Sequence, residues 1–189
     1  MKYNKKIATV SDYFRYYFQA AYSLFKFITK NKKVMDKMFV ERVMLAVTEV
    51  NGCKMCYQGH AKMALESGLT ETEINELVNN NQDNVPQHQQ VALLYATHYA
   101  DVSGRPDKEA TKKLFDTYKR GIAKSIISAI RMIMLGNTLG IVASTVELKK
   151  SEKREAGSSL SRELIIFLGS LVLLPIFILV FVIGMIVNY

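Results

Sequence analysis

The sequence predicts an all-α protein: a compact helical domain followed by a single C-terminal transmembrane helix. Three observations predict this fold class. Apolar residues in the first 148 positions recur at spacings of three and four, the period of an amphipathic helix. No segment alternates in the way that predicts a strand. Residues 164–187 are 24 residues without a charge, and as a helix of about 36 Å they are long enough to cross a hydrocarbon core of about 30 Å.

The first three helices are bounded by start and stop signals. Apolar and aromatic residues at helical spacing predict an amphipathic helix over residues 10–29. A second helix is predicted over 36–50, because the Asn-Gly pair at 51–52 accepts the left-handed conformation in which helices end. A third begins near Cys53 and stops at Gly68.

A fourth helix is predicted from a capping box. Thr70 and Glu73 have the spacing at which a hydroxyl and a carboxylate satisfy reciprocal backbone donors, just before an apolar run. A polar break over residues 79–85 follows. Three further helices are predicted over 86–101, 106–120 and 122–148.

The chain divides into three parts. Residues 1–148 are long enough to bury one core and are predicted to form the helical domain. Residues 149–163 are rich in charged and small residues and are predicted to be a linker. Residues 164–187 are predicted to be the membrane helix. The alternative, a buried core helix, is disfavoured because such helices rarely run so long without a polar face.

Basic residues gather on the N-terminal side of the predicted span. They are Lys149, Lys150, Lys153, Arg154 and Arg162, whereas only Asn188 and Tyr189 follow the span. Because positive flanks stay on the cytoplasmic side, the helical domain is expected in the cytoplasm and the chain is expected to be a single-pass protein of the cell membrane.

The formal net charge is +8, and nearly all of the excess lies in the first 33 residues. A basic segment suits an anionic lipid surface, at about 1 kcal/mol per well-placed cation, and an ordinary solvated basic face is the alternative. No nucleic-acid recognition motif is present, so the lipid membrane is a predicted partner and nucleic acid is not.

Both cysteines of the chain lie in one motif, Cys53-Lys54-Met55-Cys56, which is followed by His60. At the start of a helix the two cysteines share a face and can close a disulfide. His60 lies four residues beyond Cys56, where its imidazole can accept the thiol proton or stabilise the thiolate. The helix N-terminus adds partial positive charge, so the thiol pKa is expected to be lowered and the pair reactive.

Three other uses of the cysteine motif compete with redox chemistry. A c-type haem is excluded because Tyr57, not histidine, follows the second cysteine. Zinc held by Cys53, Cys56 and His60 lacks the usual fourth ligand. Inert buried thiols are the third alternative. No metal and no other cofactor is predicted.

Glu41 is a further candidate because of the helical stripe on which it lies. It shares a face with Met44, Leu45 and Thr48, which would turn its carboxylate toward the interior. The alternative is a solvated glutamate paired with Lys37, four residues before it.

Residues 41 to 60 carry the pattern E-x11-C-x2-C-x3-H. This pattern, and the wider stretch 40–74, resembles the alkylhydroperoxidase D-like branch of the carboxymuconolactone decarboxylase superfamily. The decarboxylases themselves generally lack the cysteine pair, so the resemblance implies thiol chemistry. The resemblance implies that Cys56 attacks the peroxide and that Cys53 resolves the intermediate. It also implies that His60 activates the Cys56 thiol and that Glu41 orients the proton network.

The resemblance has two further implications. Met55 stands where alkylhydroperoxidase D has another histidine, and a thioether cannot relay protons. The family forms helical trimers or larger assemblies, which implies a homo-oligomer with the stripe from Tyr13 to Ile28 as a candidate contact surface.

Two functions are compatible with these features. The first is an oxidoreductase, a membrane-anchored thiol-dependent peroxidase or disulfide reductase that reduces hydroperoxides and is re-reduced by a cellular dithiol donor. The alternative is a non-enzymatic membrane redox sensor or scaffold whose cysteine pair changes conformation on oxidation. His88 and His98 are interpreted as structural or surface residues.

Overall fold

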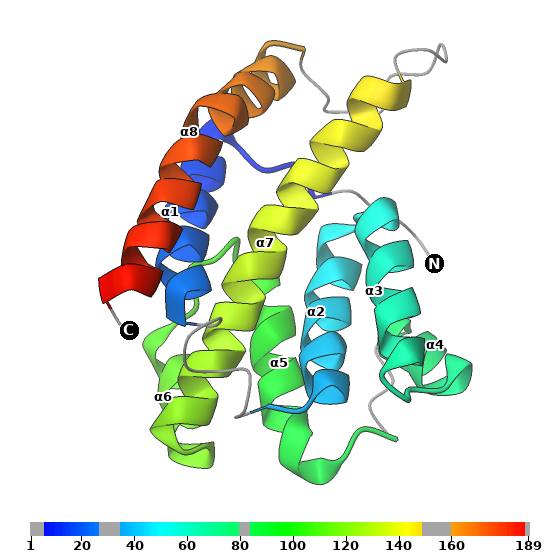
Figure 1. Ribbon diagram of the computed structural model, residues 1–189. Helices are drawn as coiled ribbons and strands as arrows, with labels where there is room; N and C mark the ends of the chain where they lie inside the picture. Colours follow the sequence, from blue (N-terminus) through cyan, green and yellow to red (C-terminus); the bar gives the residue numbers. More distant parts are fainter. Residues whose placement is uncertain (1–5, 27–34, 80–83, 149–159, 188–189) are drawn as a thin grey trace.

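The computed structural model describes residues 6–26, 35–79, 84–148 and 160–187 (Figure 1). No strand occurs in these four ranges, so the prediction of an all-α fold is confirmed. The helices are α1 (Val10–Lys26), α2 (Lys37–Asn51), α3 (Lys54–Glu66), α4 (Glu71–Val78), α5 (Gln87–Asp101), α6 (Lys108–Thr117), α7 (Arg120–Leu148) and α8 (Leu160–Val187).

The long helix α7 runs through the middle of the fold (Figure 1). It contacts α1, α2, α3, α5, α6 and α8, and the side chains of Ile126, Ile130 and Met134 on it are almost fully buried. Among the described residues, the stretch Arg120–Ser144 is long and apolar enough to cross a membrane. Its most apolar part is 61% buried inside the fold, which is typical of the core helix of a soluble domain.

The helix ends follow the sequence signals. Asp36 caps α2 by accepting a hydrogen bond from Phe39 N at 2.7 Å, and Gly52 ends that helix at a φ of +68°. Thr70 and Glu73 form the predicted capping box at the start of α4. The boundaries predicted from these local motifs are confirmed.

Two boundaries differ from the predicted ones. Gly121 lies inside α7 and separates no helices, because the break falls between α6 and Arg120. The predicted linker reached residue 163, but α8 already begins at Leu160. Glu163 is 5% exposed and Ile166 is 2% exposed, so packing against the core orders this first turn. Residues 27–29 and 149–159 lie outside the described residues.

Helices α1 and α8 lie side by side and run in the same direction (Figure 1). Tyr13 Oη lies 2.8 Å from Ser170 Oγ, and Tyr17 Oη donates a hydrogen bond to the carbonyl oxygen of Leu173. Tyr13 is 0% exposed and Tyr17 is 6% exposed. In this arrangement α8 covers the buried half of the stripe from Tyr13 to Ile28, whose role as a subunit contact stays a prediction, and Ile28 lies outside the described residues.

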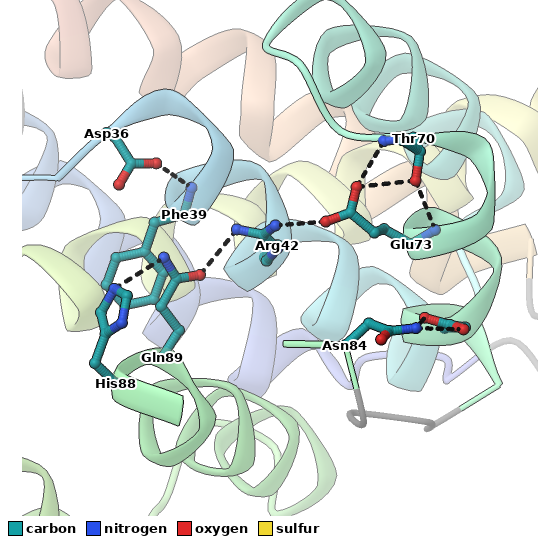
Figure 2. Close-up of polar contacts among 9 residues, drawn as sticks. Asp36, Phe39, Arg42, Thr70, Glu73, Asn84, His88 and Gln89 are labelled. Atoms are coloured by element: carbon teal, nitrogen blue, oxygen red, sulfur yellow. Dashed lines mark hydrogen bonds and ion pairs between the residues drawn. The ribbon is translucent and has the colours of Figure 1, made fainter. Parts of the chain in front are cut away.

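A polar cluster joins α2, α4 and α5 (Figure 2). Arg42, which is 5% exposed, donates to Glu73 Oε1 at 2.9 Å and to Gln89 Oε1 at 3.1 Å. Glu73 Oε2 accepts from Thr70 N at 2.8 Å, and this hydrogen bond is the main reason that the pKa of Glu73 lies below its ordinary value. One carboxylate therefore caps α4 and also ties it to a buried guanidinium on α2.

Candidate redox site

Cys53 and Cys56 are joined in a disulfide at the start of α3. Cys53 is the N-cap of this helix, and its Sγ accepts a hydrogen bond from Cys56 N at 3.3 Å. Cys53 is 1% exposed, whereas Cys56 is half-buried. An external reagent therefore reaches Cys56 first, while Cys53 lies behind it.

The disulfide rests on the backbone of α7 at Gly140. A Cβ added at this position would lie 2.5 Å from Cys56 Sγ and 2.7 Å from Cys53 Sγ, so no other residue fits without a shift of the sulfur atoms or of the helix. Cys56 Sγ also lies 3.7 Å from the carbonyl oxygen of Gly136, which can accept a hydrogen bond from the reduced thiol. Gly140 was not predicted; the available signal was a glycine pair, four residues apart, in a long apolar helix.

Glu41 of α2 reaches across to His60 of α3. Its Oε2 lies 2.8 Å from His60 Nδ1, and the two side chains are only 12% and 15% exposed. The predicted inward orientation of Glu41 is confirmed. An imidazole that donates its Nδ1–H to a carboxylate has Nε2 as its proton acceptor.

The C-terminal end of α2 is held against α7 close to the disulfide. Thr48 Oγ1 donates to Asn137 Oδ1 at 3.1 Å, and Asn51 Nδ2 lies 3.3 Å from Met134 Sδ. These four side chains are at most 5% exposed. These contacts fix α2 on α7. They therefore set the position of Glu41, which α2 carries, relative to Gly140 and the disulfide above it.

Three further side chains surround the start of α3. Met55, where the resemblance to alkylhydroperoxidase D implied a second histidine, is 47% exposed, and its Cε would lie 3.4 Å from a Cβ at Gly140. Burial raises the pKa of Tyr57, and the negative charge of Glu49 contributes. Burial also raises the pKa of Glu49. Neither Glu49 nor Tyr57 was predicted as part of the site.

The described part of the chain contains no group of three or more His, Cys, Asp or Glu side chains placed to hold a metal ion. His98, interpreted as structural or surface from the sequence, lies 2.8 Å from Asp107 through Nε2 and Oδ2. The backbone N–H of Ala110 and the charge of His98 hold the pKa of Asp107 below its ordinary value. The backbone oxygen of His88 accepts a hydrogen bond from Tyr118 Oη at 2.7 Å. Both histidines therefore have structural contacts.

Residues 12–84 match the carboxymuconolactone decarboxylase family. Through this segment, which is less than half of its length, the chain is similar to that family. An alkyl hydroperoxide reductase AhpD from Corynebacterium kroppenstedtii is 40% identical to the chain over 48 residues, which are 25% of the chain and 28% of that protein. The chain thus matches less than a third of the length of this curated relative. No solved structure matches the chain. The family segment contains the cysteine motif, His60 and Glu41, whereas Gly140 and α8 lie outside it.

Proposed function

We propose that this protein is a thiol-dependent peroxidase that reduces hydroperoxides through Cys56 and Cys53. The observation that supports the proposal best is the 2.8 Å contact between Glu41 and His60, one helical turn beyond a disulfide whose second cysteine is the more exposed. A base oriented by a carboxylate next to a reactive thiol is the arrangement that thiol catalysis needs. The name of the alkyl hydroperoxide reductase relative agrees with this chemistry.

The oxidative half of the cycle uses the two cysteines in turn. His60 Nε2 takes the proton of Cys56, and the thiolate attacks one oxygen of the hydroperoxide, so the O–O bond breaks and an alcohol leaves. Cys56 is then a sulfenic acid. The Cys53 thiolate attacks that sulfur, water leaves, and the disulfide forms.

The reductive half needs an external dithiol. One of its thiolates attacks Cys56 Sγ, the exposed sulfur, and Cys53 leaves as a thiolate. The Cys56 N–H, which donates to Cys53 Sγ at 3.3 Å, would stabilise that leaving thiolate at the helix N-terminus. The second thiol of the donor then displaces Cys56, and the donor becomes a disulfide.

Turnover with a dithiol tests the proposal. Cys56→Ser is expected to abolish peroxide consumption, whereas Cys53→Ser is expected to consume one equivalent and accumulate a sulfenic acid on Cys56, detectable by mass spectrometry after dimedone labelling. A wild-type protein that consumes only one equivalent per chain would be a redox sensor. Full turnover by Cys56→Ser would show that the assigned roles are wrong.

We also propose that α8 anchors the protein in a membrane. At least eleven large apolar side chains of α8 are more than a third exposed: Leu164, Ile165, Phe167, Leu168, Leu171, Val172, Ile176, Ile178, Leu179, Val182 and Ile183. Moving such half-exposed side chains from water into lipid contributes about 1 kcal/mol each, or on the order of 10 kcal/mol together. Detaching α8 uncovers parts of both α1 and α7, among them Tyr13 and Tyr17, at a cost of about 1.5–3 kcal/mol for each side chain that was fully buried. The observation that supports the anchor is the exposed apolar face of α8.

Membrane fractionation tests the anchor, and protease protection tests its orientation. The full chain is expected to stay in the membrane pellet after carbonate extraction. In sealed, right-side-out cells an external protease is expected to leave residues 1–150 undigested, because the basic flank keeps the domain inside. Digestion of the domain in sealed cells would reverse the orientation, and a chain that extracts into the supernatant would remove the anchor.

A further inference from the structure

A cavity lies away from the cysteine motif, between α1, α5, α6 and α7. Its volume is about 420 Å³, within the range of about 300–1,000 Å³ usual for small-molecule sites. Aromatic rings form much of its wall: Tyr22, Tyr95, Tyr99 and Phe115. Tyr95 and Tyr99 are almost fully buried, whereas Tyr22 is 61% exposed and Phe115 is 37% exposed, so the cavity has a closed inner wall and an accessible rim.

The charged side chains that line this cavity are positive. Arg131 and Lys124 of α7 both line it, and no aspartate or glutamate is among the described residues that do. Within the described part of the chain, neither cation has an ion pair with a carboxylate. A guanidinium beside apolar walls is a strong donor for a carboxylate, because it can bind both oxygens at once.

Neighbouring side chains orient the guanidinium. Arg131 Nε lies 3.4 Å from Tyr99 Oη, which in turn donates to Gln19 Oε1 at 3.0 Å. This chain of contacts uses the inner edge of the guanidinium, so the two terminal NH2 groups of Arg131 remain to bind an anion. Tyr95 Oη lies 3.3 Å from Thr111 Oγ1, and burial raises the pKa of Tyr95, so its phenol stays neutral.

We propose that this cavity binds a small organic acid with an aromatic or short apolar body, whose carboxylate is held by Arg131 and assisted by Lys124. The four aromatic rings take the apolar body, and the cations select the acid over its neutral analogues. The site is separate from the disulfide: Arg131 and Gly140 are nine residues apart on α7, or about 13.5 Å along the helix axis. The proposal therefore does not depend on the cysteine chemistry.

A matched pair of ligands tests the selection. The full chain, reconstituted in lipid nanodiscs, is titrated with 4-phenylbutyrate and with 4-phenylbutyramide by ligand-observed NMR, and empty nanodiscs give the background. The acid is expected to bind at least about tenfold more tightly than the amide, because the amide cannot make the charge-assisted contact. Equal binding of the two compounds, or no binding of the acid, would overturn the proposal.

Substitutions then locate the site. Arg131→Gln is expected to weaken 4-phenylbutyrate about tenfold and to leave the amide unchanged, and Lys124→Gln, at an exposed position, to weaken the acid about threefold. Arg120→Gln removes an exposed cation of the same helix that does not line the cavity, so it is expected to change neither affinity. If neither Arg131→Gln nor Lys124→Gln changes the affinity for the acid, the carboxylate is not bound here and the proposal is wrong.

Discussion

Gly140 of α7 lies directly under Cys56 of α3, so close that a Cβ at Gly140 would stand 2.5 Å from the cysteine Sγ. Gly136, one turn earlier on the same helix, is different, because its added Cβ meets only Ile133 Cδ1 at 3.7 Å, an ordinary contact. Substituting each glycine in turn therefore tests whether the disulfide needs the absence of a side chain at Gly140.

Gly140→Ala is expected to lower the free energy of unfolding of the oxidised protein by about 1–3 kcal/mol, because the methyl group overlaps both sulfur atoms. Gly136→Ala is expected to leave stability unchanged or to raise it by up to about 1 kcal/mol, since alanine favours the helix and meets no obstacle. Urea denaturation followed by circular dichroism measures both. Equal effects of the two substitutions would contradict the close approach.

His60→Ala is expected to slow peroxide reduction by on the order of 10²–10⁴-fold, because the proton acceptor for Cys56 is lost. Glu41→Gln is expected to slow it less, since the imidazole remains but its 2.8 Å carboxylate contact becomes an amide contact. The measurement is the rate of peroxide consumption at saturating dithiol. Glu66→Gln, on the exposed face of α3, is the control and is expected to keep the wild-type rate.

Arg42→Met is expected to destabilise the protein by about 1–3 kcal/mol, because it leaves Gln89 and Glu73 without their shared donor. Lys62→Met removes the partner of Glu66 at 3.9 Å on an exposed surface, and such pairs contribute about 0–1 kcal/mol. Thermal unfolding of the two variants compares a buried and an exposed cation of similar length. Similar losses would mean that the α2–α4–α5 cluster contributes no more than a surface pair.

Acid sensitivity is expected to depend on Glu73. Its pKa is lowered in the folded protein, chiefly by the Thr70 backbone N–H, so its stabilising effect is fully present above the unfolded pKa of about 4.3 and is lost as the pH falls through the folded pKa. Glu73→Gln is therefore expected to destabilise the protein at pH 7, with a difference from wild type that shrinks below about pH 4. Denaturation curves from pH 7 to pH 3 measure this difference. If the difference in stability between wild type and Glu73→Gln does not change with pH, the charge of Glu73 does not stabilise the fold.

A cross-link is expected to report whether α8 is docked or inserted. In a background without Cys53 and Cys56, the pair Tyr13→Cys and Ser170→Cys replaces two side chains whose oxygen atoms lie 2.8 Å apart. Because cysteine is much shorter than tyrosine, the two sulfur atoms cannot form a disulfide, and a bifunctional thiol reagent with a reach of about 10 Å is used instead of oxidation. The reagent is expected to leave the two cysteines unlinked in lipid vesicles, where α8 is inserted. A cross-link that forms in vesicles would mean that α8 stays on α1 and lies along the membrane surface. Reduced Cys53 and Cys56 in the parent protein provide the control for the reagent.

The sequence predicted those features that short motifs determine. Gly52 and the Thr70–Glu73 box fix helix ends through backbone conformation and local hydrogen bonds, so their signals stand within a few residues. The cysteine motif and His60 were recognisable for the same reason. Contacts between distant segments were not predictable in this way. Gly140 acquires its role only when α3 is packed on α7, and nothing in the sequence of α1 indicates that a helix 150 residues later covers it.

The contact of α1 with α8 also orders events during synthesis. Helix α1 leaves the ribosome early, but the surfaces of Tyr13 and Tyr17 that α8 covers have no cover until residues 166–173 have been made. Until then the side chains of Tyr13 and Tyr17 are exposed to water or bound by a chaperone. The core of the nascent domain is therefore incomplete until α8 has been synthesised. Docking on the domain and insertion into a bilayer then compete for α8.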